Sequence, residues 1–158
     1  MKRILIFLLS VLFTGFTFAA GSSHLKSYTA TGNFDTIKEE VTLAITNRGL
    51  VIDHTSFIGN MLDRTGKDID KARKVYDKAE ALQFCSANFS RRTMEADPGN
   101  IVFCPYVIAI YSLASDPKKV HVAFRLPQSA GSEESQASLK AVEDLLDSIV
   151  KEALGLKK

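Results

Sequence analysis

Two consecutive segments in the second half of the chain constrain the fold most strongly. From Tyr106 to Leu113 the sequence is almost continuously apolar, which is typical of a central strand covered on both faces. Pro105 marks the start of this strand, because proline cannot donate a hydrogen bond to the sheet. A turn at residues 115–119 leads into Val120–Leu126, where apolar residues occupy every second position. The two segments predict an antiparallel hairpin.

The rest of the chain alternates between strand and helix patterns. Asn33 is expected to cap a helix whose apolar residues recur at spacings of three and four, and Gly49 to end it in the left-handed conformation. We further predict strands at 24–31, 50–55 and 81–85, helices at 57–63, 69–78, 90–96 (capped by Asn88 or Ser90) and 138–154, and a polar linker at 127–136. This order predicts an α+β, two-layer sandwich, with a mixed or antiparallel sheet and helices packed mainly on one face.

The N-terminus has the features of an export signal. Lys2 and Arg3 precede an apolar run that ends near Phe18, and small residues follow up to Gly21. The run is shorter than the roughly 20 apolar residues that cross a bilayer, so we expect cleavage and no stable membrane insertion afterwards. The sequence therefore predicts a signal peptide at 1–21, a single domain at 22–158 and a location in the periplasm of a Gram-negative bacterium.

The charge of the exported part argues against one class of partner. The whole chain has 20 basic and 18 acidic residues, and loss of Lys2 and Arg3 with the signal leaves 18 of each. A chain without net positive charge has no electrostatic attraction for nucleic acid. The expected partner is therefore an unknown small ligand or periplasmic protein, and a homodimer is also open.

Cys85 and Cys104 are the two cysteines of the chain. Cys85 ends one predicted strand and Cys104 precedes the next, so a disulfide could join the two strand ends across the short helix between them. A redox-active pair is an alternative, although such pairs usually form a CxxC motif at a helix N-terminus. Free thiols that bind a metal or carry sulfur are a third possibility.

Other polar residues are weaker candidates. Arg91 and Arg92 lie beside Ser90 at the start of a predicted helix, where guanidinium and backbone N–H groups could hold an anion. Ser90 lacks the GxSxG context of a serine hydrolase. We predict a binding rim made of the following residues: His54, Ser86, Ser90, Arg91, Arg92 and Tyr106.

No cofactor or metal is predicted. The three histidines are too scattered for a metal motif by spacing, and His54 shares strand parity with Ile52, which predicts that it points toward the core or its edge. A haem- or copper-binding accessory protein remains an alternative with soft or imidazole ligands, although no CxxCH motif is present. The residues that such a site would draw on are His54, Met61, Cys85, Met94 and Cys104.

Several short motifs together resemble the domain of unknown function 302 family. They are Phe34-Asp35, Arg48-Gly49-Leu50, the stretch from Met61 to Gly66, Phe84-Cys85-Ser86-Ala87, Glu95-Ala96-Asp97-Pro98, and Cys104-Pro105-Tyr106 with the apolar strand to Tyr111. The resemblance runs from Tyr28 to Pro127 and implies a small α+β domain. It implies no settled activity.

The chain departs from this family at the second cysteine. Many members look as if they carry Cys-Asn-Pro in the first loop and Leu-Pro-Cys in the second, whereas here Cys104 precedes Pro105. This shift fits an exported variant rebuilt around a disulfide. Our leading hypothesis is a non-enzymatic periplasmic module that binds a small ligand or partner near Cys85, Arg91 and Cys104. Thiol redox or sulfur handling by the two cysteines is the alternative.

Overall fold

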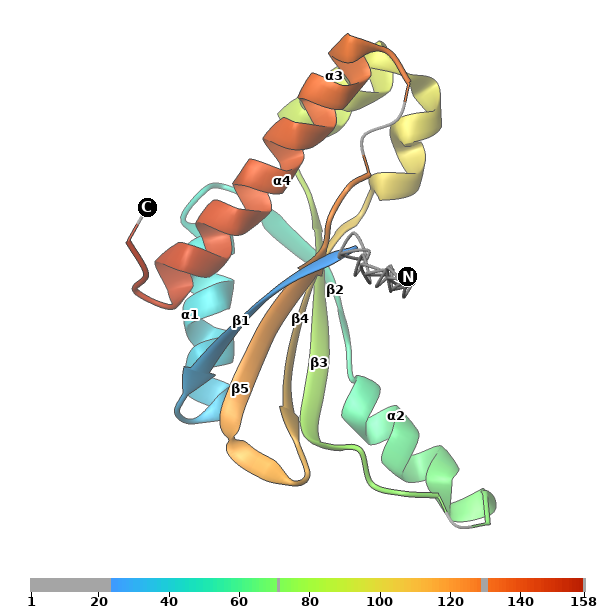
Figure 1. Cartoon of the computed structure of the whole chain (residues 1–158), viewed down its shortest axis with the longest axis vertical. Helices are drawn as coiled ribbons and strands as arrows, with labels where there is room; N and C mark the ends of the chain where they lie inside the picture. The colour runs from blue at the N-terminus through green and yellow to red at the C-terminus, as the bar shows by residue number, and fades with distance from the viewer. Residues whose placement is uncertain (1–23, 71, 129–130, 158) are drawn as a thin grey trace, which may run out of the picture.

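The computed structural model describes residues 24–70, 72–128 and 131–157. In these segments, five strands form one antiparallel sheet in the order β1-β5-β4-β3-β2 (Figure 1). The strands are β1 Leu25–Thr31, β2 Val51–Ser56, β3 Tyr76–Cys85, β4 Tyr106–Leu113 and β5 Asp116–Arg125. The α+β fold and the predicted hairpin, now β4 and β5, are confirmed. The signal peptide predicted at 1–21 lies outside the described residues.

The helices of the described segments include one whose two ends were predicted from capping residues in the sequence. They are α1 Phe34–Thr46, α2 Ile58–Thr65, α3 Ala87–Ala96 and α4 Glu133–Ala153, with short 3₁₀ helices η1 Gly66–Asp68 and η2 Pro98–Phe103. The Asn33 side chain caps α1 by accepting from the backbone N–H groups of Asp35 and Thr36. Gly49 has a φ of 70°. Both predictions for α1 are confirmed.

The last helix begins earlier than residue 138. Ser132 is its N-cap, and the Ser132 side chain accepts from the Ser135 N–H at 3.2 Å. Residues 133–136 are therefore helical, and the linker predicted to end at 136 is too long. Ser135 is fully buried, so tertiary packing favours this extra turn.

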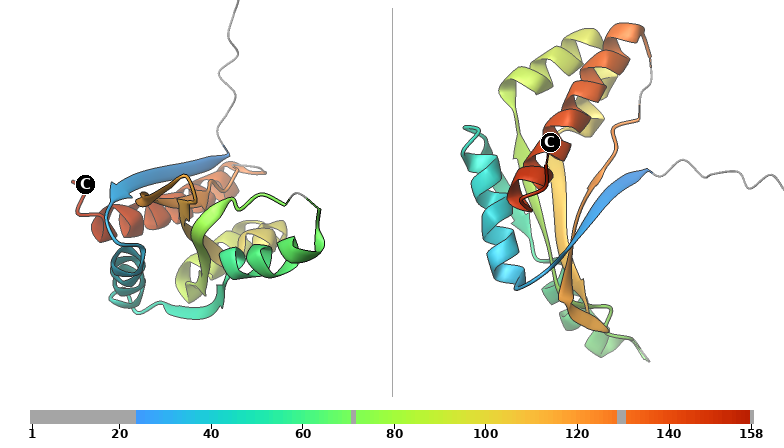
Figure 2. Two further views of the ribbon diagram at one scale, coloured as in Figure 1. Left: turned by 90° about the horizontal axis from the view of Figure 1, so that it is seen from below. Right: turned by 60° about the vertical axis from the view of Figure 1, so that its left-hand side comes forward.

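The core lies between one face of the sheet and the helices α1 and α4. Figure 2 shows both helices on the same side of the sheet. Apolar residues from these helices and from the three central strands form one buried cluster, which includes Phe34, Val41, Ile45, Phe84, Ile108, Ile110, Val122, Phe124, Val142, Leu146 and Ile149. Burial along β4 alternates between buried and half-buried positions. The prediction that both faces of this strand are fully covered is therefore wrong.

The helix predicted at 69–78 is also wrong. β3 starts at Tyr76 and runs antiparallel to β4, with Lys78 opposite Ser112 and Glu80 opposite Ile110. Lysine, alanine and glutamate favour helices in isolation, but pairing with a long apolar strand overrides this weak preference. For the same reason the strand predicted at 81–85 is ten residues long.

The short helix after β3 also starts earlier than expected. α3 begins at Ala87, with Ser86 as an N-cap whose side chain makes no capping hydrogen bond. The Ser90 N–H donates to the Ser86 carbonyl at 2.8 Å, which closes the first turn. Asn88 and Ser90 therefore lie inside the helix, and neither is its cap.

A polar cluster ties the edge strand β1 to α4. Asp147 accepts a hydrogen bond from the Tyr28 hydroxyl and pairs with the Nζ atoms of Lys26 at 2.7 Å and Lys151 at 2.9 Å. Burial raises the pKa of Asp147, but the hydrogen bonds from Lys26, Tyr28 and Lys151 together outweigh it and lower the pKa to about 2. The folded state therefore favours the ionised carboxylate.

Replacing Asp147 with asparagine is expected to lower the free energy of unfolding at pH 7 by roughly 1.5 kcal/mol, a value discounted for solvent screening. Because the folded pKa lies below the unfolded one, this stabilisation is present above about pH 4. It is lost as the pH falls through about 2. Urea unfolding of both proteins between pH 7 and pH 2 checks this, and a difference that does not shrink on acidification would contradict it.

Candidate functional site

The sheet brings the two cysteines together at one of its ends. β3 ends at Cys85, and β4 begins shortly after Cys104. Phe84 of β3 pairs with Tyr106 of β4, so the two cysteines lie at the same end of the sheet. The two Sγ atoms are 2.7 Å apart. Both cysteines are half-buried, and their sulfur atoms are in direct contact. The predicted proximity of the cysteines is confirmed, and their covalent state remains a prediction.

The environment of Cys85 disfavours thiolate chemistry. Burial raises the pKa of the Cys85 thiol to about 12, and the hydrogen bond with Cys104 and the nearby charge of Asp53 add to this effect. A helix N-terminus usually lowers the pKa of a nearby thiol, but here the burial of Cys85 dominates although α3 starts at Ala87. In its reduced form Cys85 is therefore a protonated, weakly nucleophilic thiol at neutral pH.

Three of the predicted rim residues lie beside the cysteines. The Ser90 hydroxyl lies 3.6 Å from the Cys104 sulfur and 3.4 Å from the Tyr106 hydroxyl. Tyr106 is only 4% exposed and packs edge-on against Phe84. Ser86 is buried at the N-cap of α3. Tyr106 and Ser86 are therefore buried beside the cysteine pair and form no exposed rim.

The arginines are arranged differently from the prediction. Because α3 begins at Ala87, Arg91 and Arg92 lie in its second turn, away from the free N–H groups of the first turn. Arg91 is mostly exposed and pairs with Glu95 at 3.5 Å. One side of α3 lines a shallow depression that is open to solvent, formed by Ala87, Asn88, Arg91, Met94 and Glu95. This arrangement does not favour the anion site predicted at a helix N-terminus.

His54 lies on the other face of the sheet. Ile52 pairs with Phe84, but His54 pairs with Gln83, because an irregularity in β2 inserts one extra residue between them. Such a bulge reverses the side to which the following side chains point. His54 is exposed as a result, and the prediction that it faces the core or its edge is wrong.

The residues considered for haem or copper lie on separate elements. Met61 is on α2 and Met94 is on α3, which are at opposite ends of the molecule in Figure 1. His121 stacks on Tyr111 at a centroid distance of 4.8 Å, and its Nδ1 lies 3.0 Å from the Thr29 hydroxyl. Among the described residues, no three His, Cys, Asp or Glu side chains lie close enough to hold a metal ion.

Sequence reasoning missed three exposed aliphatic residues beside the cysteines. Val51 pairs with Cys85 across β2 and β3, and the Ile101 carbonyl accepts from the Cys104 N–H at 3.1 Å. Val51, Ile101 and Val102 are 69%, 60% and 74% exposed. The apolar triplet Ile101-Val102-Phe103 before Cys104 could have indicated this surface in the sequence. Its exposure depends on η2, however, and no helix was predicted there. We call these three residues the aliphatic rim.

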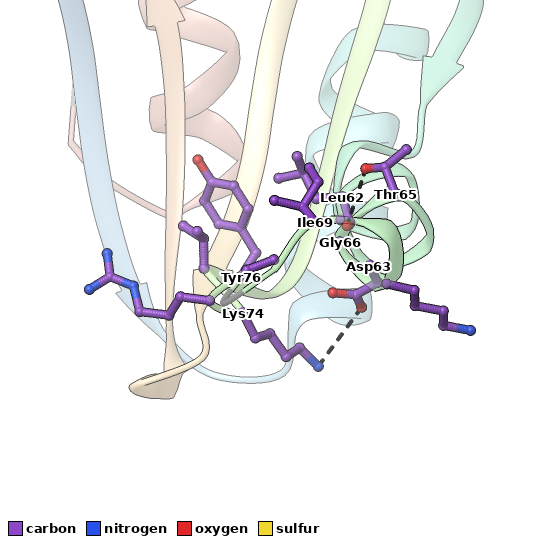
Figure 3. Close-up of a pocket in the computed structure, with 12 residues that line it drawn as sticks. Leu62, Asp63, Thr65, Gly66, Ile69, Lys74 and Tyr76 are labelled. Atoms are coloured by element: carbon purple, nitrogen blue, oxygen red, sulfur yellow. Dashed lines mark hydrogen bonds and ion pairs between the residues drawn. The ribbon is translucent and has the colours of Figure 1, made fainter.

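At the cysteine end, the depression on α3 measures about 520 Å³ but is open to solvent, and the second cavity is too small for most ligands. A cavity of about 50 Å³ lies under η2 and is lined by residues that include Val102, Pro105, Tyr106 and Leu146. Typical ligand cavities measure about 300–1,000 Å³. A larger cavity of about 320 Å³ lies at α2, at the opposite end of the molecule (Figure 3).

Comparison with protein families matches residues 26–153 to the domain of unknown function DUF302. The chain belongs to the DUF302 family. The match confirms the resemblance and extends it beyond Pro127, through α4. A crystal structure of an uncharacterised conserved DUF302 protein from Bacillus stearothermophilus is similar, with a TM-score of 0.68 and 10% identity. The similarity covers 82% of this chain and 98% of that one, and at this identity it shows the fold alone.

Two further findings limit what is known of this DUF302 protein. The curated proteins include no significant match. Within the described segments, none of the helices has the length and apolar character needed to cross a membrane.

Proposed function

We propose that this DUF302 protein is exported to the periplasm, loses residues 1–21 and acts there as a non-enzymatic module that binds a protein partner. The aliphatic rim beside the cysteines carries the proposal. Val51 lies beside Cys85 and Ile101 beside Cys104, so exposed apolar side chains flank the cysteine pair on both sides. Exposed apolar surface of this kind is typical of protein contact sites. At this end the cavity under η2 is only about 50 Å³ and the depression on α3 is open to solvent, and both features favour a protein partner over an enclosed small ligand.

A disulfide between Cys85 and Cys104 would keep the aliphatic rim rigid. Two thiols lose two protons and two electrons when the bond forms, and a disulfide-bearing oxidant in the periplasm would accept the electrons and become a dithiol. The contact between the sulfur atoms supports this step. The bond would tie α3 and η2 to the ends of β3 and β4, so that the partner meets an ordered surface.

Photo-crosslinking tests the partner site. A photoreactive residue at position 102 is expected to give a discrete crosslinked product in periplasm, and Val51→Asp with Ile101→Asp should abolish it. The control places the same residue at Lys118, an exposed position on β5. Equal products at both positions would contradict the proposal. A product of two copies of this chain would identify the partner as a homodimer, and N-terminal sequencing of the periplasmic form tests the cleavage.

Reversible thiol–disulfide chemistry of Cys85 and Cys104 is the second candidate function. The contact between the two sulfur atoms favours this chemistry over other kinds of enzyme activity. Thiol labelling of freshly isolated periplasm distinguishes the two. A structural disulfide predicts no labelling of Cys85 or Cys104 before strong reduction. A redox protein predicts partial labelling and a bond that mild dithiols reduce. The absorption spectrum of the same sample tests the haem or copper alternative.

A further inference from the structure

A concave site with walls from several elements lies between α2 and the start of β3. It has a volume of about 320 Å³, at the lower end of the range for ligand cavities. Its lining comes from α2, η1, the segment that follows η1, and the first residue of β3. Figure 3 shows Leu62, Ile69 and Tyr76 around this space. The site is remote from the aliphatic rim and independent of the proposed function.

A close helix–strand contact positions the wall of this pocket. Gly59 of α2 is buried against β3, and a Cβ atom at this position would lie only 3.0 Å from the Ala79 backbone nitrogen. Glycine therefore lets α2 approach the strand this closely, and a larger residue would push the helix and the strand apart. After α2 the chain passes through η1 and then enters β3 at Tyr76. The pocket lies between α2 and the segment that leads from η1 to β3.

The apolar part of the pocket lining is mainly aliphatic. Leu62 and Ile69 are 40% and 60% exposed, although both side chains are apolar. Tyr76 supplies the aromatic ring among the lining residues, and Tyr111 holds it edge-on at a centroid distance of 5.5 Å. One ring offers no sandwich for a planar aromatic ligand. Aliphatic walls instead suit a flexible saturated chain, which gains from burying methylene groups.

The charged residues that line the pocket are exposed, and this charged edge, which we call the mouth, carries an excess of positive charge. Lys67, Arg73 and Lys74 line it together with one carboxylate, Asp63. Lys74 Nζ and Asp63 Oδ2 are 4.0 Å apart, and both side chains are about half exposed, so this ion pair is weak (Figure 3). A second carboxylate could therefore bind Lys74 and the other cations through charge-assisted hydrogen bonds.

We propose that this pocket binds a medium-chain monocarboxylate, with its alkyl chain against Leu62, Ile69 and Tyr76 and its carboxylate among Lys67, Arg73 and Lys74. The apolar interior and the net charge of the mouth together select this class. A neutral alkyl chain lacks the ionic contact, and a cationic one is repelled.

Calorimetric titration of the purified protein tests the ligand class. Octanoate is expected to bind about tenfold more tightly than octanol, and octylammonium should not bind measurably. Affinity should rise about fourfold for each methylene from hexanoate to octanoate. Amide chemical shifts should change mainly within residues 59–76. Equal binding of octanol and octanoate, no binding of any acid, or shifts confined to another region would overturn the proposal.

Charge variants test the mouth in both directions. The double variant Lys67→Gln, Arg73→Gln is expected to weaken octanoate binding about tenfold. Asp63→Asn removes the competing carboxylate and should tighten binding about threefold. Lys118→Gln, a matched control on β5, should change nothing. Because all these side chains are exposed, thermal melting should be unaltered. Weaker binding in Asp63→Asn, or equal losses in the double variant and the control, would overturn the proposal.

Discussion

Truncating Phe84 to alanine is expected to lower the free energy of unfolding by about 4 kcal/mol. Phe84 is fully buried on the core face of β3 and is one of the largest buried side chains. Its ring packs edge-on against Tyr106 at a centroid distance of 6.1 Å. Loss of the ring therefore removes buried apolar area and leaves a cavity directly beside the residues that support the cysteines.

Chemical denaturation of the wild type and the Phe84→Ala variant measures this loss. Phe57→Ala is the matched control, because Phe57 is 53% exposed and its truncation should cost less than about 1 kcal/mol. A loss of similar size in the two variants would mean that Phe84 does not fill the core as the structure describes.

Replacing Cys104 with alanine is expected to lower the free energy of unfolding of the oxidised protein by about 3 kcal/mol. The disulfide would close a loop that contains α3 and η2, and its loss returns conformational freedom to the unfolded chain. The native contacts around position 104 change little, since the Ser90 hydroxyl retains Tyr106 as a partner at 3.4 Å. Most of the effect is therefore on the unfolded state.

A reductant separates the disulfide from simple packing at Cys104. Excess dithiol should destabilise the wild type by a similar amount and leave Cys104→Ala unchanged, when both are unfolded in urea. If the wild type is equally stable with and without the reductant, the disulfide is absent or contributes nothing. The outcome bears on the partner site, because the disulfide would tie η2, which carries Ile101 and Val102, to the end of β3, beside which Val51 lies.

Features set by local sequence were predicted well. The α1 helix, its Asn33 cap and its glycine at position 49 follow from residues within a few positions of one another. The β4–β5 hairpin follows from a continuous apolar run in the first strand and from apolar alternation in the second, which reflects the two-residue period of a strand. The approach of Cys85 to Cys104 also followed, because each cysteine lies at the end of a predicted strand.

The errors occur where distant pairing overrides local preference. Residues 76–80 join β3 because β4 lies beside them, although their side chains favour a helix. The bulge in β2 turns His54 away from Ile52, and no local signal marks it. The early start of α3 moves Arg91 and Arg92 out of the first helical turn. The bulge in β2 and the early start of α3 altered the predicted binding rim.

By itself, the sequence determined the α+β class, most of the strands and helices, the family resemblance and the proximity of the two cysteines. These depend on backbone period, capping and turn residues, which act over a few positions. Only the tertiary structure decided the length of β3, the exposure of Val51, Ile101 and Val102, and the pocket beside α2. The exposure of side chains and the presence of cavities depend on how elements far apart in the chain pack together. Sequence patterns that extend over a few residues do not contain this information.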